Sequence, residues 1–233
     1  AYTGASKKVR LQIAKDGGET YTYVLRNSNY DFFPLSLGAG GYTINIYENI
    51  KDSSYALAFG THVDVTIENE FLPFLYSNQY VFFDESSAAV QKGSELAKET
   101  YDELGVVENV YEFVVKNIKY DYDKAATVES GYIPDIDETL STKKGICFDY
   151  ASLMVAMLRT QRIPTKLIFG YAGKDYHAWI SVYIEDVGWV DGVIRFDGES
   201  WVRMDPTFAS TSSIIDRNSY VGDGEHYADM YYF

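Results

Sequence analysis

The chain's single cysteine lies in the stretch Lys144-Gly145-Ile146-Cys147-Phe148-Asp149-Tyr150-Ala151. Apolar residues recur after it at helical spacing to about Arg162, and Pro164 ends the pattern, so we expect a helix that begins at Cys147. Backbone N–H groups and the positive end of the helix dipole stabilise a thiolate at such a position. Taken alone, the position suits a buried structural cysteine equally well.

A histidine begins a second informative segment, His177-Ala178-Trp179-Ile180-Ser181-Val182-Tyr183-Ile184, which alternates as a β-strand does. His177 shares the more polar face with Trp179, so its imidazole can point across at a helix N-terminus. A hydrogen-bonded histidine with a structural task gives the same pattern. The other two histidines are weaker partners for Cys147, because His62 lies in the β-rich half and His226 lies in an acidic tail.

A carboxylate follows in Trp201-Val202-Arg203-Met204-Asp205-Pro206-Thr207. Alternation places Asp205 at the end of a strand, where its carboxylate can accept the Nδ1–H of His177 and orient the imidazole. An ordinary Asp-Pro turn is the simpler interpretation of this dipeptide alone. A cysteine at a helix start, with a histidine and an aspartate on strands, is typical of an activated thiol nucleophile.

These three motifs together resemble the transglutaminase-like superfamily of papain-fold thiol enzymes, in its bacterial type. The resemblance covers roughly residues 90–210. It implies an α+β fold, in which helices pack on an antiparallel sheet. It also implies that Cys147 is the nucleophile, His177 the general base and acid, and Asp205 the residue that orients His177.

The chain departs from the family pattern around the oxyanion site. Animal transglutaminases place an oxyanion-stabilising tryptophan before the cysteine, whereas all three tryptophans here follow Cys147, and residues 135–146 contain no glutamine. The Cys147 backbone N–H can supply one oxyanion contact. Candidates for the second donor are Tyr120, Tyr122 and Gln91. Candidates for the lining of the substrate cleft are Asp149, Tyr150, Tyr176 and Trp179.

The first part of the chain has a different residue pattern from the part that holds these motifs. Short alternating segments at 7–13, 21–25, 42–47 and 62–68, separated by turn residues, predict a small antiparallel sandwich or barrel. Helical spacing then predicts one helix from Ser86 or Ser87 through Leu104 and another over residues 108–119, with a loop over 120–144. We therefore expect a β-sandwich-like module at 1–85 and a catalytic domain at 86–233.

Composition excludes several classes of protein. The 233 residues include 34 acidic and 20 basic side chains, a net charge of −14, which disfavours nucleic-acid and anionic-membrane partners. No apolar run is long enough to span a membrane. We expect no metal or other cofactor, and interpret Asp135, Asp137 and Glu138 as a solvated acidic loop rather than a calcium site. The low pI and abundant tyrosine favour an extracellular or cell-surface location, with the cytoplasm left open.

The motifs predict cysteine-dependent acyl transfer on amide bonds of a peptide or protein substrate. A cysteine protease, peptidase or amidase is the preferred activity, because nothing in the sequence identifies a docking site for a second amine. Two alternatives stay open at this point: crosslinking by a protein-glutamine transglutaminase, and a non-catalytic extracellular interaction module on the same fold. The oligomeric state is equally open.

Overall fold

A computed structural model of the chain describes residues 2–4, 6, 8–25, 31–98, 100–191, 193–196, 201–204 and 227–233, with the backbone alone for 193–196 and 201–204. These residues form two compact units, Ala1–Pro73 and Phe74–Phe233. The sequence predicted a boundary near residue 85 instead. Residues 74–85 pack with the second unit, where the Tyr76 carbonyl accepts a hydrogen bond from Arg159 and the Tyr80 carbonyl one from Ser152. That the two parts are separate domains, a β module and a catalytic domain, stays a prediction.

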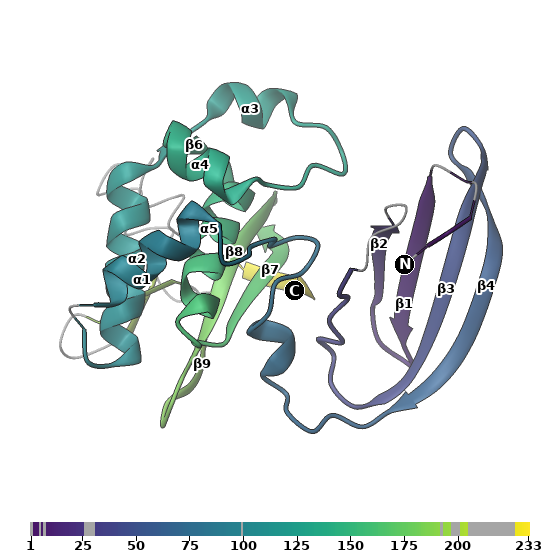
Figure 1. Cartoon of the computed structure of the whole chain (residues 1–233), viewed down its shortest axis with the longest axis horizontal. Coiled ribbons are helices and arrows are strands. Elements are labelled where there is room, and N and C mark those ends of the chain that lie inside the picture. The colour runs from purple at the N-terminus through teal and green to yellow at the C-terminus, as the bar shows by residue number, and fades with distance from the viewer. Residues whose placement is uncertain are drawn as a thin grey trace. The chain divides into compact units, whose positions relative to one another are not determined.

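The first unit is built on one antiparallel sheet of four strands, in the order β2-β1-β3-β4 (Figure 1). The strands are β1 (Val9–Lys15), β2 (Thr20–Leu25), β3 (Gly40–Lys51) and β4 (Ser54–Val65). The predicted alternation is confirmed in the first two strands. Their inward side chains are almost fully buried: Val9, Leu11, Ile13, Tyr21 and Tyr23.

The prediction of a sandwich or barrel was wrong for the described residues, which hold a single sheet in this unit. The sequence predicted separate short strands at 42–47 and 62–68, but residues 42–47 and 62–65 belong to two strands of twelve residues each, and residues 66–68 follow the end of β4. A turn at Asp52, whose φ is +51°, joins them into one long ribbon. The residues that would have supplied a second sheet therefore extend the first one.

An exposed ion pair in this sheet carries a prediction about pH. The Nε2 atom of His62 lies 2.9 Å from a carboxylate oxygen of Asp16. This hydrogen bond, together with the charge of Asp16, raises the pKa of His62 above its ordinary value of 6.5. We expect an NMR titration to show the raised pKa, and the Asp16→Asn variant to lower it towards 6.5.

The sign of the linked stability change follows from this shift. Because the folded chain binds the proton more tightly than the unfolded chain, the stabilisation is present below pH 6.5 and is lost as the pH rises through the folded pKa of His62. It should be small, since both side chains are exposed. An unchanged His62 titration in Asp16→Asn would contradict the assignment, and His62→Gln identifies the resonance.

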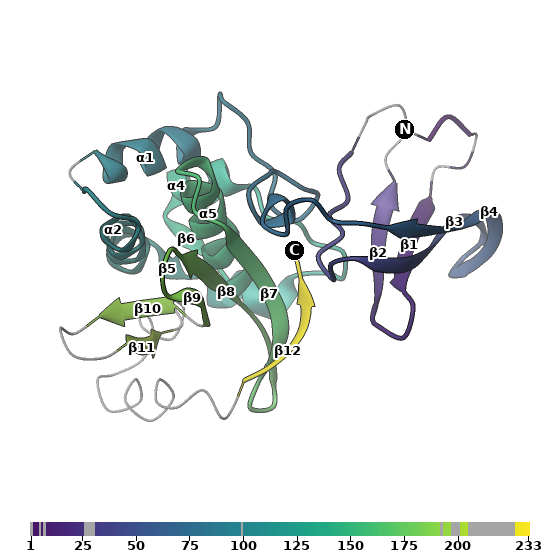
Figure 2. The ribbon, with the colours of Figure 1, turned by 90° about the horizontal axis from the view of Figure 1, so that it is seen from below.

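The second unit combines helices with an antiparallel sheet of order β12-β7-β8-β9 (Figure 2). The α-helices among its described residues are α1 (Ala88–Ala97), α2 (Glu103–Asn117), α3 (Tyr122–Thr127), α4 (Ile136–Thr142) and α5 (Cys147–Thr160). A 3-10 turn, η1 (Leu72–Phe74), precedes them. The strands of this sheet are β7 (Thr165–Ala172), β8 (Asp175–Ile184), β9 (Gly188–Asp191) and β12 (Tyr227–Tyr232). The described residues also form two strand pairs: β5 (Lys119–Tyr120) with β6 (Lys144–Gly145), and β10 (Val193–Phe196) with β11 (Trp201–Met204). The predicted α+β class, with helices on an antiparallel sheet, is confirmed.

Helix α5 forms the centre of this unit. Every residue from Phe148 to Arg159 is buried, because α1, α2 and α4 cover one side of the helix while β7 and β8 lie against the other (Figure 2). The approach of α1 is close: a Cβ atom added at Gly93 would lie 2.9 Å from the backbone oxygen of Met157. The predicted helix over residues 147–162 is confirmed to within two residues of its end.

Two other helix predictions were wrong in their boundaries, and one segment predicted as a loop contains helices. The helix expected to run through Leu104 ends at Ala97, and α2 begins at Glu103 rather than at residue 108. The cause is Asp102, whose carboxylate accepts the Gly105 N–H at 2.7 Å and so starts a new helix. The loop predicted at 120–144 contains α3 and α4, which Asp121 and Asp135 start in the same way.

Candidate active site

Cys147 is the first residue of α5 and is partly exposed. The backbone that leads into it is fixed from outside the helix. The N–H of Lys119 donates to the carbonyl of Lys143, and the N–H of Asp121 donates to the carbonyl of Gly145, each at 2.9 Å. The thiol therefore lies at the positive end of a buried helix, and hydrogen bonds from residues 119 and 121 hold the backbone that precedes it. Such a position favours a reactive thiolate.

His177 is the third residue of β8 and lies opposite Gly170 of the neighbouring strand β7. It is buried, with 8% of its surface exposed. Its ring centroid lies 6.4 Å from that of Trp179 in a stacked arrangement. The strand that carries the histidine packs directly against the helix that carries the cysteine.

A series of aromatic contacts runs from Phe148, next to Cys147, to Tyr176, the residue before His177. Phe148 meets Phe169 at 4.8 Å between ring centroids, and Phe169 stacks on Tyr176 at 6.2 Å. The pKa of Tyr176 is raised mainly by burial, and the neighbouring Cys147 contributes to the rise. Alternation along β8 directs His177 to the face opposite the one that Tyr176 and Phe169 share. Helix α5 and strand β8 pack against each other, and pairing of the His177 imidazole with the Cys147 sulfur is a proposal.

Asp205 lies outside the described residues. The residue before it, Met204, ends β11 and pairs with Val193 of β10. Strand β10 in turn lies against β8, the strand of His177. The described chain therefore reaches Met204 along a ribbon beside the histidine strand, and the position of Asp205 stays a prediction.

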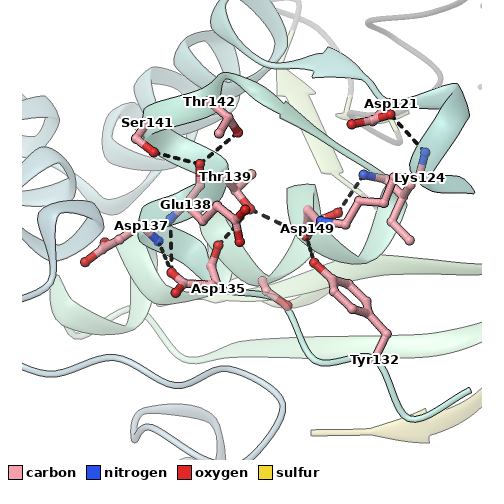
Figure 3. A network of polar contacts seen from close by, with 12 residues as sticks. Asp121, Lys124, Tyr132, Asp135, Asp137, Glu138, Thr139, Ser141, Thr142 and Asp149 are labelled. Atoms are coloured by element: carbon pink, nitrogen blue, oxygen red, sulfur yellow. Dashed lines mark hydrogen bonds and ion pairs between the residues drawn. The ribbon is translucent and has the colours of Figure 1, made fainter. Parts of the chain in front are cut away.

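The carboxylate of Asp149 is the centre of a buried polar network (Figure 3). Its Oδ2 atom accepts the backbone N–H of Ile146 at 2.7 Å. Its Oδ1 atom accepts the hydroxyl of Tyr132 at 2.5 Å and the ammonium of Lys124 at 2.9 Å, with the hydroxyl of Thr139 at 3.5 Å. One side chain thus connects the residue before Cys147 with α3, with α4 and with the segment between them.

The negative charge of Asp149 is compensated by a lysine inside the network. Asp149 has no exposed surface, so its negative charge needs a partner, and the Lys124 ammonium supplies one. The same ammonium lies 4.5 Å from the centroid of the Tyr132 ring. The pKa of Tyr132 is raised by burial first and then by its hydrogen bond to Asp149, so the hydroxyl stays a donor at neutral pH.

The acidic residues before Cys147, predicted to form a solvated loop, lie at the start of α4 and cap two helices. Asp135 accepts the N–H groups of Asp137 and Glu138 at the start of α4, each at 3.0 Å. Asp137 accepts the N–H groups of Ala88 and Ala89, and so caps α1 from a distant part of the chain. Within the described part of the chain, no three His, Cys, Asp or Glu residues are gathered to hold a metal ion.

Three residues predicted to line the substrate cleft are buried instead. Asp149 and Tyr150 have no exposed surface, and Trp179 has 1%. The hydroxyl of Tyr150 donates to the carbonyl of Ile118 at 2.7 Å, so this side chain belongs to the core. Tyr176 keeps 56% of its surface exposed beside Cys147, and it stays a candidate for the cleft.

The three candidates for the second oxyanion donor lie on different elements of the structure. Tyr120 pairs with Gly145 across the β5–β6 ladder, two residues before the nucleophile, and its ring meets that of Tyr122 at 4.9 Å. Gln91 is exposed on α1, and its role as an oxyanion donor stays a prediction.

Sequence reasoning missed three partners of Asp149, namely Lys124, Tyr132 and Thr139. One signal was available. Asp149 stands three residues after Ile146, which is the spacing at which an acidic side chain reaches back to the N–H before a helix. That spacing predicts the backbone bond, but the other three partners come from segments that only the tertiary fold brings near.

The fold and the site define a helix-borne cysteine beside an antiparallel sheet that carries a histidine. Residues 91–206 match the model of the transglutaminase-like superfamily. A transglutaminase-like domain therefore occupies this part of the chain, as the motifs predicted.

Two curated relatives are similar to part of the chain. UPF0252 protein MJ1282 of Methanocaldococcus jannaschii is 37% identical over 101 residues, which cover 38% of this chain and 29% of that protein. The protein-glutamine gamma-glutamyltransferase of Pseudomonas aeruginosa is 26% identical over 110 residues, which cover 40% of this chain and 15% of that enzyme. The chain thus matches less than a third of the length of either relative.

Two solved structures are similar to this chain at low sequence identity. A Cytophaga hutchinsonii protein, provisionally described as a cysteine protease, has a TM-score of 0.49 and 15% identity, covering 98% of this chain and 77% of that one. The periplasmic domain of TgpA from Pseudomonas aeruginosa has a TM-score of 0.43 and 14% identity, covering 88% and 89%.

Proposed function

We propose that this chain catalyses acyl transfer on amide bonds, with Cys147 as nucleophile, His177 as general base and acid, and Asp205 as the residue that orients His177. The observation that carries the proposal is the position of Cys147 at the start of α5, inside a transglutaminase-like domain that spans all three residues. A purely structural cysteine needs neither partial exposure nor hydrogen bonds that hold the backbone before it at the start of a helix.

The chemistry follows from the residue types. The His177 imidazole takes the proton of the Cys147 thiol, and the thiolate attacks the amide carbonyl carbon. The Cys147 backbone N–H stabilises the negative oxygen of the tetrahedral intermediate. The C–N bond then breaks, the amine leaves with the proton from His177, and a thioester remains on Cys147.

The acceptor of the acyl group decides between two activities. Water, losing a proton to His177, gives hydrolysis and a free carboxylic acid, whereas a lysine amine gives a crosslink. We favour hydrolysis of a peptide or protein, because the residues around Cys147 include no identified docking site for a second amine. Similarity to a protein-glutamine gamma-glutamyltransferase supports crosslinking as the second candidate.

We place the substrate outside the cytoplasm, on the evidence of the acidic, tyrosine-rich composition. None of the helices in the described part of the chain is long and apolar enough to span a membrane.

The rate of Cys147 alkylation by iodoacetamide against pH tests the proposed pair. We expect the wild type to react readily at pH 6, and the His177→Ala variant to lose this reactivity or to need a higher pH, because the imidazolium no longer stabilises the thiolate. A sluggish reaction that rises only near pH 8.5, equal in both proteins, would show that His177 does not activate Cys147. His62→Ala is the matched control, since His62 belongs to the other unit.

A further inference from the structure

We propose that Asp149 is a positioning residue for Cys147: its carboxylate holds the backbone at the start of α5 so that the thiol and the Cys147 N–H face the substrate. The inference rests on the proposed role of Cys147 as nucleophile. It adds a residue that the triad does not contain, and it gives Lys124 and Tyr132, which belong to other segments, a part in the reactivity of the thiol.

The first support is the contact with Ile146. This residue precedes Cys147 and has an extended backbone, with φ −95° and ψ 178°. Its N–H, which belongs to the Gly145–Ile146 peptide, is held by Asp149 Oδ2 at 2.7 Å, so this peptide cannot turn without breaking a buried charge-assisted hydrogen bond. The direction of the thiol and of the Cys147 N–H depends on this peptide and on the extended backbone of Ile146 that follows it.

The second support is the closeness of Gly145. A Cβ atom at this position would lie 2.5 Å from the Cβ atom of Asp149, so a side chain there would push Asp149 away from Ile146. Gly145 is itself tied to β5 through its pairing with Tyr120. The segment before the nucleophile is therefore clamped between β5 and the Asp149 side chain.

The third support is the fit of the remaining partners to the carboxylate. Lys124, Tyr132 and Thr139 all approach Oδ1, which leaves Oδ2 for the backbone of Ile146. An asparagine cannot reproduce this arrangement, because turning its oxygen to Ile146 would turn its NH₂ group towards the Lys124 ammonium. The site thus selects a carboxylate in particular.

The direction in which Asp149→Asn changes the rate of Cys147 alkylation distinguishes a positioning role from a purely electrostatic one. Removing a negative charge near a thiol favours the thiolate, so a purely electrostatic role predicts faster alkylation of Cys147 in Asp149→Asn. A purely structural role predicts an unchanged rate in a less stable protein. Positioning predicts a slower reaction, because a frayed first turn no longer presents its N–H groups to the sulfur.

We therefore expect Asp149→Asn to lower the alkylation rate at pH 7 by about tenfold while the circular dichroism spectrum is kept. Asp102→Ala is the control, because this carboxylate caps α2 and its removal should cost stability without changing the rate. An unchanged or faster reaction in a folded Asp149→Asn variant would overturn the inference.

Lys124 provides a test that does not depend on the folding of Asp149→Asn, since its side chain is 28% exposed. Lys124→Met leaves the carboxylate without this cation. Loss of a nearby positive charge raises the midpoint of alkylation by itself, so the measured quantity is the plateau rate at high pH; we expect this rate to fall by about threefold in Lys124→Met and to be restored in Lys124→Arg. Lys116→Met is the control, since it removes a lysine from a surface ion pair with Glu112. Equal plateau rates in Lys124→Met and the wild type would contradict the inference.

The outcomes separate this inference from the proposed function. If His177→Ala leaves the alkylation profile unchanged while Lys124→Met lowers its plateau rate, the triad fails and the positioning role of Asp149 stands. If His177→Ala shifts the profile and neither Asp149→Asn nor Lys124→Met changes it, the triad stands and Asp149 serves stability alone.

Discussion

Replacing Cys147 by alanine is expected to abolish turnover of amide substrates, with a loss of at least about a thousandfold in kcat. The reason is chemical, because no neighbouring group can replace the sulfur in forming the thioester. The fold should survive, because the residue is small and partly exposed at the first position of α5.

Two assays measure this result and distinguish the candidate activities. Release of fluorescent peptides from a labelled unfolded protein reports hydrolysis, and incorporation of a fluorescent primary amine into the same protein reports transfer. Both signals should disappear in Cys147→Ala, and thermal unfolding should show a protein as stable as the wild type. Full activity in this variant would remove the proposed mechanism, whereas wild-type inactivity in both assays over a broad substrate panel would favour an interaction module.

Replacing Arg159 by methionine is expected to destabilise the second unit by about 3–5 kcal/mol. Arg159 has 1% of its surface exposed, and its guanidinium donates to the carbonyls of Thr165, Phe233 and Tyr76 at 2.6–2.9 Å. These carbonyls belong to the start of β7, the end of the chain and the segment after η1. One side chain thus joins α5 to three separate segments.

The size of the effect comes from the acceptors that are left behind. A buried cation is costly, and burial lowers the pKa of Arg159 to about 9. Replacing a complete buried ion pair by apolar residues is often neutral, but here the partners are backbone carbonyls, which lose the guanidinium donor in Arg159→Met. The Phe233 carbonyl keeps a hydrogen bond from the Leu167 N–H at 2.8 Å, so the penalty comes chiefly from the carbonyls of Thr165 and Tyr76, and it exceeds the gain from removing the charge.

Thermal and denaturant unfolding measure this loss, which should lower the unfolding midpoint by about 10 °C. Arg162→Met is the matched control, because Arg162 is exposed just beyond the same helix and should change the midpoint little. Equal midpoints for Arg159→Met and the wild type would show that water or neighbouring groups satisfy the three carbonyls.

The candidate site could be read from the sequence in part. The helix that begins at Cys147 and the strand that begins near His177 are both where their apolar periodicity predicts them, since a buried helix and a buried strand each repeat at a local spacing. The cleft residues were chosen less well, because Asp149, Tyr150 and Trp179 turned out to be buried. Burial depends on which distant segment covers a side chain, and no local pattern contains that information.

Helix ends show the same division. Asp102, Asp121 and Asp135 each start a helix through a bond to a nearby N–H, which is a local signal that was present in the sequence. The cap of α1 is different, because Asp137 reaches it from another part of the chain. A single-sequence reading can find the first kind of cap and not the second.

The sequence by itself determined the α+β class, the order of cysteine helix and histidine strand, and the superfamily, because these depend on local periodicity and on short motifs in a fixed order. The tertiary structure alone decided that Asp149 joins Ile146 to Lys124, Tyr132 and Thr139, and that Arg159 joins three segments. The physical reason is that a buried charge takes the partners that folding brings within hydrogen-bond distance, and these partners are far away along the chain.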